Sequence, residues 1–154
     1  MKCWHKDLIN VLPRNQLIGQ WRECCMIGSN LANIGTPNHI LVNKIMEYTP
    51  DHFFTYTMLV YAELFKRGYN PNPKTINTFN ENLFKAFGRN NYFLVDHDEL
   101  FKGWHSTRYL LQCLCKIEEL YDCGGIKFED WYKILNKTRN MHVYCEETYQ
   151  SLFV

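Results

Sequence analysis

The chain has 154 residues, the size of one domain, with 46% hydrophobic and 21% charged residues. This composition excludes a disordered tail or a low-complexity array, and no apolar run of about 18 residues is present that could span a bilayer. The opening Met1–Asp7 lacks the apolar stretch of a signal peptide. We therefore expect a cytoplasmic protein with no membrane partner.

Charge is spread unevenly, although the net charge is only +1. Residues 1–74 carry eight Lys/Arg against five Asp/Glu, so a polyanion is expected to meet the N-terminal half. The seven cysteines are odd in number and include no Cys-x-x-Cys pair. Reduced thiols are favoured, and neither a metal nor another cofactor is predicted.

The first predicted helix follows Pro13, because apolar residues then recur every three or four positions. Gly28, Ser29 and Asn30 are expected to end it. Its apolar stripe includes Trp21, which we expect in the core together with Trp4. Another side of the same helix carries Gln16, Gly19, Gln20 and Glu23.

Two further helices are predicted to start at Thr36-Pro37 and Thr49-Pro50, since proline after a capping hydroxyl is typical of a first turn. The second of these runs to Gly68. Others are expected from about residue 73 to Gly88, from about Asp98 to Gly124-Gly125, and from Phe128 to Leu135. The fold class predicted is all-α, with about five to six helices in one compact domain spanning residues 1–154.

Basic groups and one carboxylate gather early in the chain, at Lys2, Lys6, Arg14, Arg22 and Glu23. A carboxylate repels a polyanion unless it moves protons or stabilises a developing cation. The alternative is that Glu23 is an ordinary helix-surface residue screened by Arg22. Spacing alone leaves both interpretations open.

Asn15–Glu23 resembles the first-helix motif of the pyrimidine-dimer DNA glycosylase/AP lyase family, where Gln-His-Leu precedes Arg-Glu by four residues. Ala62–Asn70 is similar to that family's helix ending in Lys-Arg-Gly-aromatic-Asn, and Trp131-Tyr132-Lys133 to a segment near its C-terminus. Met1–His5 with Leu12–Arg14 resembles uncharacterised bacterial members. The resemblance covers about the first 75 residues.

The resemblance implies an all-α enzyme without a metal, whose N-terminal α-amine attacks C1′ of the damaged nucleotide and forms an imine. β-Elimination then cuts the strand. An α-amine titrates near 7.7 to 8, so part of it is neutral at physiological pH. In this chain the resemblance assigns the nucleophile to Met1 and the catalytic carboxylate to Glu23, while Arg22 binds a phosphate.

Three positions depart from the family pattern. Characterised members expose a Thr after loss of the initiator Met, whereas Lys2 should block that removal, leaving Met1 as the nucleophile and Lys2 in a DNA-binding position. Alternatively the Lys2 side chain supplies the amine. Gln16 replaces a His, and Met26 replaces an Arg that some members carry, which weakens the expected phosphate contact.

Extruding a nucleotide from a duplex costs several kcal/mol, which wedge side chains and cations must offset. The candidates are the DNA-binding residues Lys127, Trp131, Tyr132 and Lys133. Trp131 is equally well explained as a core residue of the last helix. The expected partner is double-stranded DNA with a lesion or abasic site, bound by a monomer.

Two other functions remain open at this point. One is a glycosylase/lyase for a different damaged or modified base, since the motifs do not determine the lesion pocket. The other is a helical nucleic-acid-binding protein that has lost the chemistry. No glycine-rich phosphate loop or nucleophile elbow is present, which argues against nucleotide hydrolysis and acyl transfer.

Overall fold

The structure, a computed structural model, describes residues 1–139. Within that range the regular structure is entirely helical, which confirms the all-α prediction. No helix in the described part is long and apolar enough to cross a membrane. The α-helices are α1 (Arg14–Ile34), α2 (Pro50–Lys66), α3 (Pro73–Phe87), α4 (Thr107–Asp122) and α5 (Phe128–Arg139), and the 3-10 helices are η1 (Lys6–Val11) and η2 (Asn43–Glu47).

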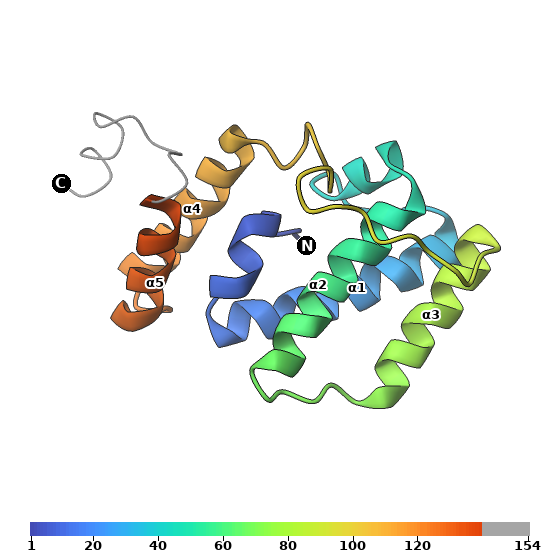
Figure 1. The fold of residues 1–154 in the computed structure, drawn as a ribbon, viewed down its shortest axis with the longest axis horizontal. Helices are drawn as coiled ribbons and strands as arrows, with labels where there is room; N and C mark the ends of the chain where they lie inside the picture. The colour runs from blue at the N-terminus through green and yellow to red at the C-terminus, as the bar shows by residue number, and fades with distance from the viewer. Residues whose placement is uncertain (140–154) are drawn as a thin grey trace.

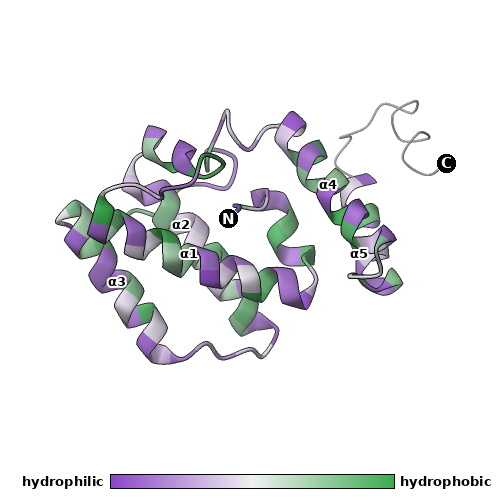
Figure 2. Ribbon diagram, turned by 180° about the vertical axis from the view of Figure 1, so that it is seen from behind, coloured by the Kyte–Doolittle hydropathy of each residue, from purple (hydrophilic) through white to green (hydrophobic). Residues whose placement is uncertain are grey.

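The helices surround the N-terminal segment. α1 packs against α2 and α3 on one side of the molecule, while α4 packs against α5 on the other. η1 lies between these groups and contacts both α2 and α5, so the chain begins in the middle of the fold (Figure 1). Figure 2 shows polar and apolar residues alternating along α3 and α4, as expected of helices with one buried face.

α1 is longer than the sequence suggests. The predicted stop at Gly28 is wrong, because the helix continues to Ile34 and ends at Gly35 in the left-handed conformation (φ 74°). Gly28 is buried, and a Cβ there would lie 3.2 Å from the Phe79 ring. The glycine therefore serves the close approach of α3 to α1.

The helix predicted to start at Thr36-Pro37 is also wrong, since this segment forms turns followed by the short η2. Asn side chains satisfy its backbone in place of a helix: Asn30 Nδ2 donates to Pro37 O (2.9 Å) and His39 N donates to Asn43 Oδ1 (3.1 Å). Asn38 adopts a φ of 57°, outside the helical region.

The helix predicted from Asp98 begins nine residues later, at Thr107. Phe101 and Gly103 have φ angles of 50° and 92°, which an α-helix cannot contain. Ser106 provides the true cap by accepting a hydrogen bond from Tyr109 N (3.3 Å). The ends predicted near Gly68 and Gly88 agree with α2 and α3.

Candidate active site

The side chain of Gln20, on α1, binds the backbone of the N-terminal segment through two hydrogen bonds. Its Oε1 accepts a hydrogen bond from Trp4 N (2.8 Å), and its Nε2 donates to Lys2 O (2.9 Å). The side chain is 1% exposed, so these bonds form out of water. One buried amide therefore fixes the backbone on both sides of Cys3.

Two tyrosines fix the same segment from the other helices. Tyr56 of α2 donates to Trp4 O (2.7 Å), and Tyr109 of α4 donates to Cys3 O (2.5 Å). Burial raises the pKa of both phenols above the ordinary range, so they remain protonated donors. Trp4 itself is 8% exposed, which confirms its predicted place in the core.

These bonds bring the start of the chain to Glu23. The Met1 α-amine lies 4.0 Å from Glu23 Oε1, and the Lys2 backbone N–H donates to Glu23 Oε2 (2.8 Å). The Glu23 side chain is 31% exposed and that of Met1 10% exposed, so the carboxylate is open to solvent while the first residue is mostly covered. A mostly covered amine and a partly exposed proton acceptor thus face each other.

Gln20→Ala is expected to lower the free energy of unfolding by about 2 kcal/mol, because the buried Trp4 N–H and Lys2 carbonyl lose their partner. Urea denaturation measures this loss. Asn80→Ala, which removes an exposed amide from α3, is the control and should change stability by less than about 0.5 kcal/mol. Equal stability of both variants would show that Gln20 does not anchor the segment.

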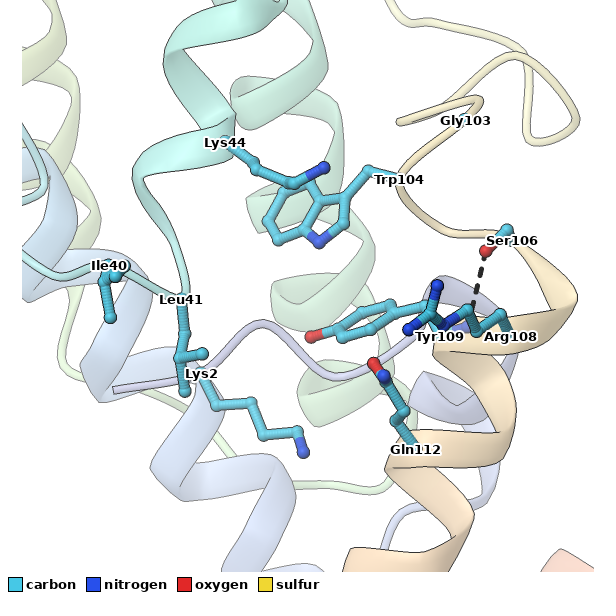
Figure 3. Close-up of a pocket in the computed structure, with 10 residues that line it drawn as sticks. All are labelled: Lys2, Ile40, Leu41, Lys44, Gly103, Trp104, Ser106, Arg108, Tyr109 and Gln112. Carbon is cyan, nitrogen blue, oxygen red and sulfur yellow. Dashed lines mark hydrogen bonds between the residues drawn. The ribbon is translucent and has the colours of Figure 1, made fainter.

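A cavity of about 490 Å³ opens beside Lys2. Its wall includes Lys2, Lys44 and Arg108 and no Asp or Glu, which makes it attractive to an anion. The Lys2 ammonium lies 4.4 Å from the Trp4 ring centroid. Figure 3 shows the lining residues, which are Lys2, Ile40, Leu41, Lys44, Gly103, Trp104, Ser106, Arg108, Tyr109 and Gln112.

Two stacked histidines link the N-terminal segment to the residues just before α4. The His5 and His105 rings are 5.1 Å apart, and His105 Nδ1 accepts from Lys6 N (2.9 Å). Burial lowers the pKa of His5 and lowers that of His105 to about 2, so both rings are neutral. The Nε2 atoms of both are buried without a hydrogen-bond partner in the described part of the chain.

Stability should therefore fall as the pH is lowered below about 6.5. The unfolded chain protonates His105 there and the folded chain does not, so the unfolding free energy drops by up to about 1.4 kcal/mol per pH unit, and the lowered pKa of His5 adds to this fall in the same direction. His105→Asn keeps an acceptor for Lys6 N and should remove the part of this slope that comes from His105, up to about 1.4 kcal/mol per pH unit, between pH 6.5 and 5. An unchanged slope in urea denaturation would contradict the assignment.

Comparison with known proteins decides the family. Residues 1–77, half of the chain, match the family described as pyrimidine dimer DNA glycosylase. The chain belongs to this family. No curated protein and no solved structure matches it. The matched half contains Met1 and Glu23, and a DNA glycosylase acts on DNA.

The other residues predicted to bind DNA do not line the cavity beside Lys2. Arg22 is exposed and forms no ion pair or hydrogen bond within residues 1–139. Gln16 and Lys127 line a second cleft of about 260 Å³, between the start of α1 and the start of α5. Lys133 faces Asp130 at 3.9 Å and lines a third cleft together with Arg14 and Arg67.

The structure corrects the prediction of Trp131 as a DNA wedge. Trp131 is 8% exposed and stacks on Tyr121 with ring centroids 5.6 Å apart, so it is a core residue joining α5 to α4. Tyr132 is 53% exposed and stacks on Phe128. Neither Trp131 nor Tyr132 lines the cavity beside Lys2.

The sequence did not reveal the cations Lys44 and Arg108 or the two anchoring tyrosines. Arg108 and Tyr109 lie beyond residue 77, where the glycosylase match ends. Lys44 lies inside the match, but a helix was predicted there. Within residues 1–139 no three His, Cys, Asp or Glu residues are arranged to hold a metal ion.

Proposed function

We propose that the protein is a DNA glycosylase with AP lyase activity that excises pyrimidine dimers, with the Met1 α-amine as nucleophile and Glu23 as the catalytic carboxylate. The observation that carries this proposal is the 4.0 Å separation between the amine and Glu23 Oε1. Family membership supports the substrate class, and the geometry supports the use of this amine.

The first stage breaks the glycosidic bond. The neutral amine donates its electron pair to C1′, and the base leaves with the electrons of the C–N bond and takes up a proton. Glu23 lies close enough to stabilise the positive charge that develops at C1′ and then to remove a proton from the bound amine. The products are an amine joined to the sugar and a base detached from that sugar, which remains linked to the neighbouring base through the cyclobutane ring.

The second stage opens the sugar and cuts the strand. The protonated Glu23 returns its proton to the ring oxygen as the ring opens, and an iminium forms between the amine and C1′. This electron sink acidifies the C2′ hydrogen. Glu23, again a carboxylate, takes that proton, and the C3′–O bond breaks with its electrons leaving on the 3′ phosphate. Arg22, which is exposed and precedes Glu23 in the sequence, and Lys2, which lines the cavity, are the candidates for binding backbone phosphates.

Two measurements test the proposal together. The protein is incubated with a duplex carrying one cyclobutane pyrimidine dimer, with and without borohydride, and an undamaged duplex of the same sequence serves as control. We expect strand cutting at the dimer and, with borohydride, a covalent protein–DNA adduct. Binding without cutting or trapping would identify a helical DNA-binding protein instead.

A further inference from the structure

Two apolar side chains project into solvent beside the cavity. Ile40 is 84% exposed, the highest value among the large hydrophobic residues of the described chain, and Leu41 is 61% exposed. Two adjacent aliphatic side chains that stay exposed to water do not stabilise the fold. Both line the cavity that Lys2 also lines.

The turn that carries them is held firmly. Asn43 N and Val42 N donate to His39 O at 2.9 and 3.0 Å, and Leu41 N donates to His39 Nδ1 at 3.3 Å. Val42, the next residue, is fully buried, and so anchors the turn in the core. The exposure of Ile40 and Leu41 is thus built into the fold and is not the result of a loose loop.

Three cations line the same cavity as this apolar pair. Lys44 comes three residues after Leu41 in the sequence. Lys2 and Arg108 are the other two cations, and no carboxylate is among the lining residues. Figure 3 shows Ile40 and Leu41 on one side of the cavity and Arg108 on the other. An apolar point flanked by positive charges matches the stacked bases of DNA flanked by their phosphates.

We propose that Ile40 and Leu41 form the wedge that enters the base stack beside the lesion, while Lys44 and Arg108 bind the phosphates on either side. This inference rests on the proposed function and adds the element that opens the duplex. Apolar wedges of Ile, Leu, Met or Phe unstack base steps in this way, and they fill the space left by an extruded nucleotide. Trp131, the wedge expected from the sequence, is buried and cannot serve.

The experiment measures unstacking without requiring chemistry. A duplex carries a pyrimidine dimer, with 2-aminopurine next to the lesion, and its fluorescence is followed as protein is added. We expect a rise for the wild type and a rise reduced at least about fivefold for the Ile40→Ala, Leu41→Ala double variant. Leu94→Ala is the matched control, because Leu94 is 72% exposed but does not line the cavity, and it should behave as wild type.

Cutting of two substrates separates this inference from the proposed function. On single-stranded DNA with an abasic site no base step needs to be opened, so the double variant should cut it within about twofold of wild type, but should cut the dimer duplex at least about tenfold more slowly. Failure of the wild type to cut either substrate would refute the lyase, while the fluorescence still tests the wedge. The wedge proposal would be overturned if the double variant gave the same fluorescence rise as the wild type and cut the dimer duplex at the wild-type rate. It would also be overturned if the wild type gave no fluorescence rise.

Discussion

Glu23→Gln is expected to slow strand cutting by about 10²- to 10⁴-fold, the range that a positioned acid–base group contributes. The amide cannot accept the proton from the bound amine or return it to the ring oxygen. It keeps an oxygen that can accept from the Lys2 backbone N–H, so the fold should be preserved. Affinity for dimer-containing DNA should be equal or higher, because a negative charge near phosphate is removed.

Single-turnover cutting and a filter-binding titration on the same duplex separate these effects. Glu81→Gln removes an exposed carboxylate from α3 and is the matched control, expected to cut at the wild-type rate. If the Glu23→Gln protein cut the duplex at the wild-type rate, Glu23 would not be the catalytic carboxylate.

Blocking the α-amine should have an effect at least as large. Acetylation of Met1 converts the amine to an amide whose electron pair is delocalised, so cutting should fall by at least about 10³-fold, as expected when a covalent nucleophile is lost. Adding one residue before Met1 would move the free amine by about 3.5 Å along the chain, comparable with its present 4.0 Å separation from Glu23 Oε1.

Lys2→Gln is the control for this prediction. Gln is long enough to keep Met1 in place, and the variant retains the free α-amine and the backbone N–H that meets Glu23, so adduct trapping should persist, although weaker DNA binding is expected from the loss of one cation. Trapping that survives acetylation but is lost in Lys2→Gln would transfer the nucleophile to the lysine side chain.

Local sequence rules predicted the helices that are governed by their own caps and periodicity. Pro50 begins α2 and Gly88 ends α3, since each rule depends on backbone geometry at one position. The rules failed where tertiary contacts decide. Gly28 stays helical because Phe79 packs against it, and the Asn43 side chain replaces helical bonding near His39.

The site was predictable only in part, for a related reason. Glu23 stood out from its place beside Arg22 in a motif, and its nearness to the chain start followed from the family resemblance. The anchoring residues were hidden, because Tyr109 meets Cys3 across more than a hundred positions of sequence. No spacing pattern reports such a contact, and the cavity near Lys2 is assembled from segments equally far apart.

The most direct test of the account is the location of the covalent bond in the borohydride-trapped complex with abasic DNA. After nuclease and protease digestion, fragment-ion mass spectrometry of the N-terminal peptide identifies the nitrogen that carries the sugar remnant. The account predicts the remnant on the α-amine of Met1, beside Glu23. A remnant on the Lys2 side chain, or no adduct under conditions in which the DNA is bound, would contradict it.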